Sequence, residues 1–230
     1  MIKNKGYYII IIFLMVGIFA GMVQNELVIP ALGNRLEPYY HGIRGENRIS
    51  ITFNVDWGED YIPGILKILE SKNVKVTFFV TGNWAGKFPD LLRQISKEGH
   101  EIGNHGYSHK NPVQLSDSQL ENHIRKNETL IYTITGKRTS LYAPPYGDIN
   151  NRVTAIVSNL GYKTIMWSAD SIDWQRPAPE IIVQRVVNKI DDGGIILLHP
   201  TKPTLQALPE IINKLKARNF KFITISELIK

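Results

Sequence analysis

The chain has 230 residues, of which 43% are hydrophobic and 21% charged, the composition of an ordinary globular domain with one sizeable core. It contains no cysteine, so disulfides, thiolate nucleophiles and cysteine-based zinc sites are excluded. The formal net charge is +6, but lysine and arginine are spread along the chain without long basic runs. The sequence therefore predicts no nucleic-acid partner and is compatible with an anionic cell envelope.

The chain begins with a charged start and a long apolar run. Lys3 and Lys5 precede the run Tyr7–Val23, which is at the boundary between a signal peptide and a membrane-spanning helix. The cleavage pattern is poor around Ala20, which favours an uncleaved anchor over a cleaved signal peptide for residues 1–24. Lysines before the span predict an extracytoplasmic remainder, either anchored to the membrane or secreted to the envelope.

Residues 25–47 are rich in proline and glycine and show little periodicity, which predicts a stalk or a surface strap. A single folded domain is expected from 48 to 230.

Within that domain, short apolar runs alternate with amphipathic helical patterns. The expected strands are Ile49–Phe53, Val74–Val80, Glu101–Gly103, Ser140–Tyr142, Lys163–Trp167, Ile195–His199 and Phe220–Thr224. The expected helices are Ile62–Leu69, Leu120–Ile131 after a Ser118-x-x-Glu121 capping box, Val153–Leu160, Glu180–Ile190 and Thr204–Ala217. This alternation predicts an α/β fold with a mainly parallel sheet, open or closed into a barrel.

In such folds the functional groups lie at the carboxyl ends of the strands. The polar residues at these positions are Asn54, Asp56, Asn104, His105, His109, Pro145, Tyr146, Asp170, Asp173 and His199. His105 and His109 form an H-x-x-x-H pair, which binds metal when both rings reach one ion. Gly106 and Pro112 predict a turn here, and an alternative interpretation is a pair of polar loop histidines.

Five segments in order resemble the motifs of the polysaccharide deacetylases, a carbohydrate esterase family that removes acetyl groups from N-acetylated sugars. They are TFNVD at 52–56, NHGYSH at 104–109, APPYG at 143–147, WSADSIDW at 167–174 and IILLHP at 195–200. The resemblance covers the chain from Arg48 onward and implies a distorted (β/α) barrel.

The resemblance also implies one divalent metal, usually Zn²⁺, with Co²⁺ or Mn²⁺ as alternatives, held by an aspartate and two histidines, the latter being His105 and His109 here. It further implies that His199 protonates the departing amine and that Asp170 orients His199.

The remaining motif residues are expected at the substrate. The resemblance implies that a backbone N–H near Tyr146 holds the oxyanion, next to Pro145. Asp173 and Trp174 are expected to shape the pocket, where the indole ring of Trp174 would stack on a sugar.

The chain departs from the family pattern in two motifs. Asn54 and Val55 stand where the family has two aspartates, the first of them the base, and Ala143 stands where it has the arginine that pairs with this base. Asp56 shares a strand face with Asn54 at a spacing of about 6.6 Å, so we assign Asp56 to the metal. Glu59 and Asp60 are the nearby acids left to act as base, although their simpler interpretation is charge at a helix start.

Several residues have a simpler structural interpretation. We expect His100 in the core or a turn, and His41 and His123 in solvent. Trp57 and Trp84 could equally be packing residues or sugar platforms.

Three functions stay open at this point. The first is a metal-dependent deacetylase of peptidoglycan-like or chitin-like polysaccharide, with a link to wall or spore remodelling. The second is a catalytically impaired homologue that binds glycan or assembles envelope, favoured by Asn54 and Ala143. The third is an amidase or deacetylase that acts on a small non-sugar amide, or a hydrolase of another type. A glycosidase with two carboxylates would leave the histidines unexplained. The sequence does not define the oligomeric state.

Overall fold

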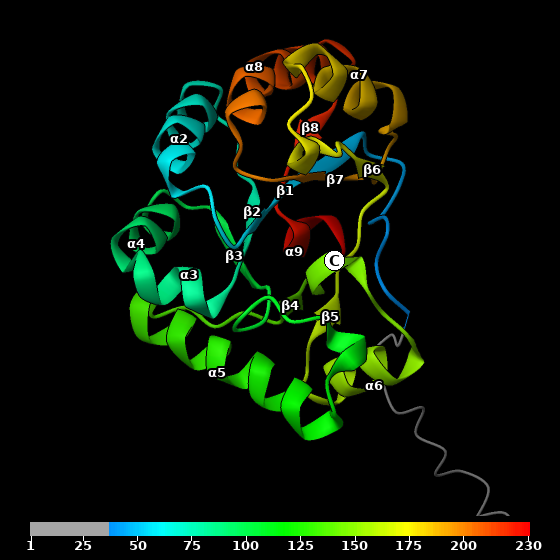
Figure 1. The fold of residues 1–230 in the computed structure, drawn as a ribbon. Coiled ribbons are helices and arrows are strands. Elements are labelled where there is room, and N and C mark those ends of the chain that lie inside the picture. Colours follow the sequence, from blue (N-terminus) through cyan, green and yellow to red (C-terminus); the bar gives the residue numbers. More distant parts are fainter. Residues whose placement is uncertain (1–36) are drawn as a thin grey trace, which may run out of the picture. The chain divides into compact units, whose positions relative to one another are not determined.

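The computed structural model describes residues 37–230, in which parallel strands curl into a half-barrel with helices around its outer side (Figure 1). The strands are β1 (Arg48–Val55), β2 (Thr77–Val80), β3 (Glu101–Asn104), β4 (Leu141–Tyr142), β5 (Lys163–Thr164), β6 (Ala169–Asp170), β7 (Ile195–Leu198) and β8 (Lys221–Phe222). The helices are α2 (Ile62–Ser71), α3 (Gly82–Lys87), α4 (Pro89–Lys97), α5 (Asp117–Thr135), α6 (Asn151–Asn159), α7 (Pro179–Lys189), α8 (Lys202–Ala217) and α9 (Ile225–Leu228). The predicted α/β class and distorted barrel are confirmed.

The sheet has the order β5-β4-β3-β2-β1-β7-β6, and β8 pairs with the first residues of β1. Every pairing between these strands is parallel. The carboxyl ends of the strands therefore lie at one edge, and the loops that follow β1, β3, β4 and β7 meet there.

The central strand β1 is buried on both faces, and its two faces differ in chemistry. Four apolar side chains point to the outer core, where the helices pack: Ile49, Ile51, Phe53 and Val55. The residues between them, Ser50, Thr52 and Asn54, face the inside of the half-barrel. The Thr52 hydroxyl donates to the carbonyl of Ile196 on β7 at 2.9 Å, so a polar side chain is accommodated inside.

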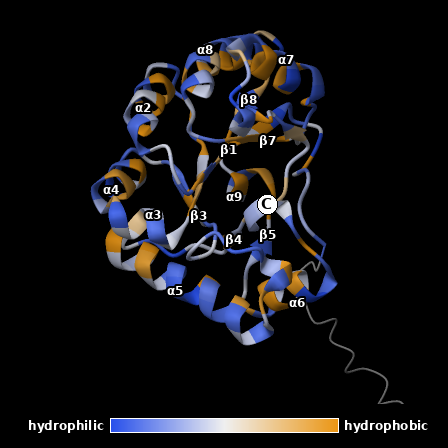
Figure 2. Cartoon of the chain, viewed as in Figure 1, coloured by the Kyte–Doolittle hydropathy of each residue, from blue (hydrophilic) through white to orange (hydrophobic). Residues whose placement is uncertain are grey.

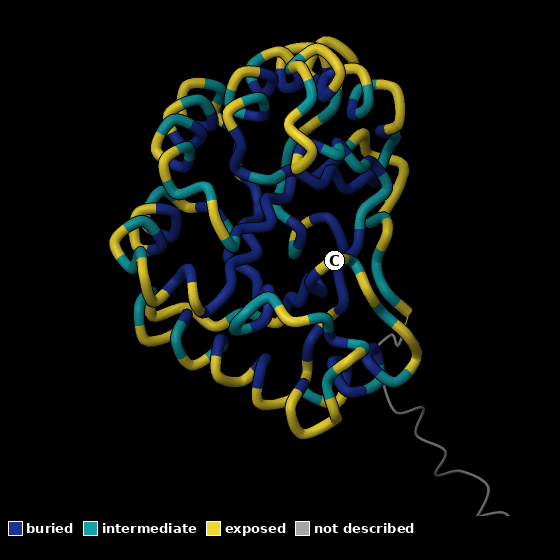
Figure 3. Tube along the Cα trace, viewed as in Figure 1, coloured by how far each residue is buried: buried dark blue, intermediate teal, exposed yellow. Residues whose placement is uncertain are grey.

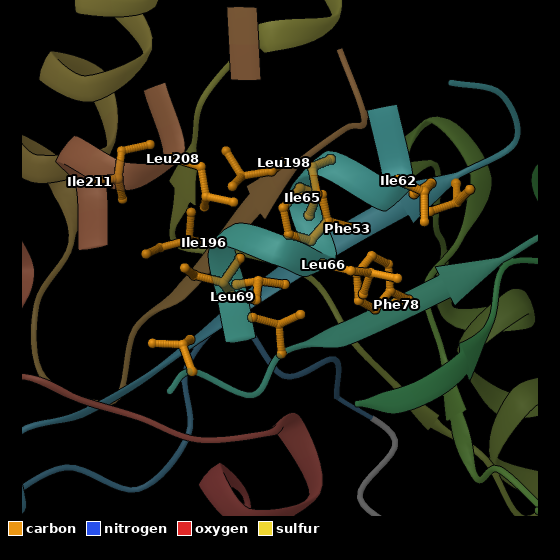
Figure 4. Close-up of a cluster of buried hydrophobic side chains, with 14 of the residues drawn as sticks. Phe53, Ile62, Ile65, Leu66, Leu69, Phe78, Ile196, Leu198, Leu208 and Ile211 are labelled. Atoms are coloured by element: carbon orange, nitrogen blue, oxygen red, sulfur yellow. The ribbon is translucent and has the colours of Figure 1, made fainter. Parts of the chain in front are cut away.

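The outer core fills the space between the sheet and the surrounding helices. Figure 4 shows side chains of α2 and α8 packed against those of β1, β2 and β7. Figures 2 and 3 show the same pattern across the domain, with apolar, buried strands and helices whose outward faces are exposed. Each fully buried Leu or Ile side chain contributes about 1.5–3 kcal/mol, so this layer carries much of the stability.

A second apolar cluster fills the inside of the half-barrel, where Figure 1 shows α9 within the curve of the sheet. Ile225 and Leu228 of α9 pack there with Phe79 of β2. The backbone N–H of Ile225 donates to the Thr77 hydroxyl at 3.0 Å, which ties α9 to the starting end of β2. The carboxyl-end edge, on the opposite side, is left for polar side chains.

Residues 37–47 run along the open side of the half-barrel as a strap (Figure 1). Tyr39 forms a bridge with Ile165 next to β5, and His41 forms one with Gly194 before β7. The N–H of Ile43 donates to the carbonyl of Leu228 at 2.9 Å. The strap interpretation therefore describes this segment better than a stalk does.

Some local predictions differ from the structure. The capping box of α5 is formed by Ser116 and Gln119, so the prediction of Ser118 and Glu121 is wrong. Both pairs fit the same four-residue pattern, and the helix begins at the earlier one. The strand predicted from Val74 begins only at Thr77. β6, α3, α4 and α9 were not predicted.

No helix in the stretch 37–230 is long and apolar enough to cross a membrane. The predicted anchor or signal peptide at 1–24 lies outside the described residues.

Candidate active site

The predicted polar cluster forms at the carboxyl-end edge of the sheet. The His105 and His109 rings lie with centroids 5.0 Å apart, and the His109 ring lies 4.6 Å from that of Tyr146. The charge of His199 acts on both histidines, and that of Asp56 acts on His109. Loops after β1, β3, β4 and β7 thus bring these five side chains together.

His105 is held by the loop after β4. Its side chain is 2% exposed, and its Nδ1 lies 2.7 Å from the carbonyl oxygen of Ala143. A neutral ring that donates Nδ1–H to this carbonyl presents a lone pair on Nε2. Burial, followed by the charge of His109, lowers the pKa of His105 to about 3, so the ring stays neutral. Ala143 therefore contributes its backbone, although it lacks the side chain expected at that position.

His109 lies in a turn, as Gly106 and Pro112 predicted. Its φ is +51°, in the left-handed region, and Gly106 before it has φ +75°. Burial lowers the pKa of His109, and the charge of Asp56 partly opposes this effect. The turn thus points a second neutral imidazole toward His105.

Asp56 follows the last residue of β1, and a hydroxyl fixes its side chain. Thr81, the N-cap residue of α3, donates to Oδ1 of Asp56 at 2.7 Å. Asn54, two residues earlier, is 7% exposed, and its buried Oδ1 has no hydrogen-bond partner within the described chain. An unpaired acceptor oxygen on β1 is therefore followed, two residues later, by a carboxylate that a hydroxyl holds in place.

The donor set suits a divalent metal such as zinc. Two neutral imidazoles, one of them oriented by a carbonyl, and a nearby carboxylate are ligands that zinc prefers. Within residues 37–230, however, no three His, Asp or Glu side chains are already spaced as a formed metal group. The side chains of Asp56, His105 and His109 would have to adjust around an ion.

His199 is oriented by Asp173, so the prediction that Asp170 does this is wrong. Oδ1 of Asp173 lies 2.7 Å from the His199 Nδ1, and its Oδ2 accepts from the His199 backbone N–H at 2.7 Å. Thr204 of α8 also donates to Oδ2, at 2.6 Å. Asp170 instead accepts from the backbone N–H of Ile172 at 2.9 Å, in a turn where Ile172 has φ +52°.

This turn has a second consequence. It carries Asp173 beneath His199, where the carboxylate is 0% exposed. Asp173 therefore cannot contact substrate, and its predicted substrate-binding role is wrong.

The rim of the site is aromatic. The Trp57 ring is nearly parallel to that of His199, at an angle of 8° and a centroid distance of 6.0 Å. Trp174 is 53% exposed and Tyr146 is 69% exposed, whereas Pro145 is buried. An open pocket of about 630 Å³ begins at His109 and Tyr146. Tyr146 is an exposed flat ring that lines this pocket, and such rings suit the apolar faces of sugars.

Glu59 and Asp60 lie in a 3-10 turn, Glu59–Tyr61, directly before α2. This placement agrees with their interpretation as negative charge at a helix start.

Three contributors to the site were not predicted from the sequence: Thr81, the position of Trp57 beside His199, and the Ala143 carbonyl. His100 is buried as expected and accepts from the Val76 N–H at 3.3 Å. His123, predicted in solvent, is only 7% exposed, so that prediction is wrong. Its position three residues after Leu120 on an apolar helix stripe was a usable signal.

Comparison with known proteins identifies the relatives of this chain. The family model described as polysaccharide deacetylase matches residues 41–165. The uncharacterized protein YlxY of Bacillus subtilis is 37% identical over 193 residues, which are 84% of this chain but only 60% of YlxY. A peptidoglycan-N-acetylglucosamine deacetylase of Bacillus cereus is 37% identical over 80% of this chain and 89% of its own length.

Among solved structures, wild-type BA3943, described as a CE4 family pseudoenzyme from Bacillus anthracis, is 38% identical. It superposes with a TM-score of 0.82 over 84% of this chain and 69% of BA3943. The fold and the site define a hydrolase scaffold with a histidine-rich centre at the open end of a half-barrel. The chain belongs to the polysaccharide deacetylase family.

Proposed function

We propose that this chain removes N-acetyl groups from a cell-wall polysaccharide of the peptidoglycan type, with one divalent metal ion held by Asp56, His105 and His109. The observation that carries the proposal is the convergence of two neutral histidines, a carboxylate and the His199–Asp173 pair at one edge of the sheet. A deacetylase of Bacillus cereus with 37% identity supports peptidoglycan as the substrate class.

The bound ion would polarise the acetamide carbonyl and ease deprotonation of water. His199 would donate a proton from Nε2 to the amine, because Asp173 holds Nδ1 on the far side of the ring. The backbone at Tyr146, which has φ +62°, would direct an N–H at the developing oxyanion. Water and the acetamide thereby give acetate and a free amine.

Asn54 stands at the position of the family's base. The amide of Asn54 is not a useful proton acceptor, and its Oδ1 is buried without a partner in the described domain. Asp56 is the carboxylate next along the strand, and Thr81 occupies only its Oδ1. We propose that the Oδ2 side of Asp56 serves both the ion and the attacking water, at reduced efficiency.

A second candidate function has its own support. The chain is 38% identical to a protein described as a pseudoenzyme, and it lacks both the base aspartate and its arginine partner, at Asn54 and Ala143. In this interpretation the site binds an N-acetylated glycan without cleaving it.

We further propose an extracytoplasmic location, which rests on the apolar run at 7–23.

Acetate release separates these functions. Purified full-length protein with Zn²⁺ or Co²⁺ is incubated with peptidoglycan fragments, chitooligosaccharides and small acetylated amines, beside a His105→Ala control. Acetate from the glycans that disappears in the control supports the deacetylase. Tight glycan and metal binding without acetate supports the impaired homologue, and faster release from the small amines supports an amidase.

A further inference from the structure

His123 of α5 is a buried histidine that contacts the turn between His105 and His109. Its side chain is 7% exposed, and its Nε2 accepts the backbone N–H of Ser108 at 2.9 Å. The Ser108 hydroxyl lies 3.3 Å from the same nitrogen. A helix residue therefore binds the backbone of the residue directly before His109.

The ring also packs against the first half of the turn. A Cβ added to Gly106, which has φ +75°, would lie 2.2 Å from Cε1 of His123. Only glycine permits both this conformation and this close approach. His123 thus contacts the backbone at two points, one after His105 and one before His109.

The chemistry of His123 suits a fixed acceptor. Because Nε2 accepts from an N–H, the proton of the neutral ring must be on Nδ1, which is buried without a partner in the described domain. An unpaired buried N–H is destabilising, and the fold tolerates this cost here. Burial, then Lys110 and His109, lowers the pKa of His123 to about 4, so it remains an acceptor at neutral pH.

The helix that carries His123 is itself anchored beneath the turn. Asn127, one helical turn later, donates to the Val80 carbonyl at 2.8 Å and to Oδ1 of Asn104 at 3.0 Å. The same Oδ1 accepts the Gly106 N–H at 2.8 Å. α5 is therefore a rigid base from which His123 fixes the turn.

We propose that His123 is a positioning residue for the metal ligands: its Nε2 holds the Ser108 backbone and thereby aims the His109 ring at the ion. This rests on the proposed metal site but not on hydrolysis. Partners that orient a ligand commonly change metal affinity 10- to 100-fold when removed.

The test compares two buried histidines that each accept one backbone N–H. His123→Leu removes the acceptor beside the site, and His100→Leu removes an equivalent acceptor from Val76 at the other end of the sheet. Zn²⁺ affinity is measured by competition with a chelator on the full-length protein. Hydrogen exchange of the amides of residues 106–110, measured without metal by mass spectrometry, reports the Ser108 bond directly.

We expect His123→Leu to lower Zn²⁺ affinity at least tenfold and to speed exchange of the turn, and His100→Leu to do neither, although both lower Tm. His123→Gln, whose amide oxygen reaches the Nε2 position, should restore affinity to within about threefold, whereas the shorter His123→Asn should not. This last pair decides the question if His123→Leu does not fold.

Unchanged Zn²⁺ affinity in His123→Leu, or an equal loss in His100→Leu, would overturn the positioning role alone. Zinc binding without acetate release would overturn only the deacetylase. A wild-type protein that binds no zinc would overturn both.

Discussion

Asp173 holds His199 through both of its carboxylate oxygens, one at the ring Nδ1 and one at the backbone N–H, each at 2.7 Å. The contact occupies Nδ1 of His199 and leaves Nε2 as the other ring nitrogen, and the Asp173 carboxylate does this from a position that solvent does not reach. The half of the site that we propose donates a proton therefore has its supporting carboxylate, while the half proposed to deprotonate water lacks the family's aspartate.

The Asp173 contact predicts an asymmetry between two aspartates of one motif. Asp173→Asn places an amide N–H₂ against either the His199 ring or the Thr204 hydroxyl, so we expect kcat for acetate release to fall roughly 10²-fold or more. Asp170→Asn, the matched control, should change kcat less than about threefold. Equal losses in both variants would contradict the assignment. Circular dichroism of each variant shows whether the fold is retained.

Restoring the missing base should raise activity. Asn54→Asp puts a carboxylate where an acceptor oxygen is already buried without a partner in the described chain. We expect acetate release to rise at least tenfold, since positioned bases contribute about 10²–10⁴-fold. Adding Ala143→Arg supplies the counter-charge, and the double variant should exceed the single one. A rate that does not change with Asn54→Asp would place the defect elsewhere.

Asp56 should control metal binding. Replacing it with Asn removes the charged ligand of the proposed set, so we expect Zn²⁺ affinity to fall at least tenfold. Glu59→Gln is the matched control, because Glu59 lies in the turn before α2, and it should bind Zn²⁺ like wild type. Unaltered affinity in Asp56→Asn would mean that another acid holds the ion. Loss of turnover with metal retained in Glu59→Gln would identify Glu59 as the base.

Acid should destabilise the domain through its buried histidines. Burial, then Lys75, lowers the pKa of His100 to about 4, while the unfolded histidine takes up a proton near pH 6.5. The contribution of neutral His100 to the free energy of unfolding is therefore complete above pH 6.5 and is lost as the pH falls toward 4. One histidine loses about 1.4 kcal/mol per pH unit in that window. The free energy of unfolding, measured with urea, should decrease between pH 7 and pH 4.5, and this decrease should be about 2 kcal/mol smaller in His100→Asn than in the wild type. An equal decrease in both proteins would contradict this origin.

The sequence predicted the parts of the site that depend on strand ends. His105 and His199 directly follow β3 and β7, and parallel pairing leaves little freedom in where such residues go, while His109 follows four residues after His105 in a turn signalled by Gly106. The choice between Asp170 and Asp173 depended on a turn with positive φ at Ile172, an isoleucine that carries no turn signal.

The two mispredicted features of α5 differ in kind. Two overlapping patterns fit its start, so the sequence could not choose between Ser116 and Ser118. His123, in contrast, lies on the stripe of Leu120, Ile124 and Ile131, and helical periodicity alone placed it inward. The polarity of the imidazole favoured solvent exposure for His123, whereas the helix periodicity favoured burial, and the periodicity is the feature that the structure confirms.

The strap, residues 37–47, limits how far the chain can be shortened at its N-terminal side. A chain trimmed to begin at Arg48 would keep every strand yet leave the carbonyls of Thr164, Gly193 and Leu228 without the N–H groups that now cap them. Bare edges of this kind invite pairing between molecules. The shortest chain that retains these hydrogen bonds should therefore start upstream of Tyr39.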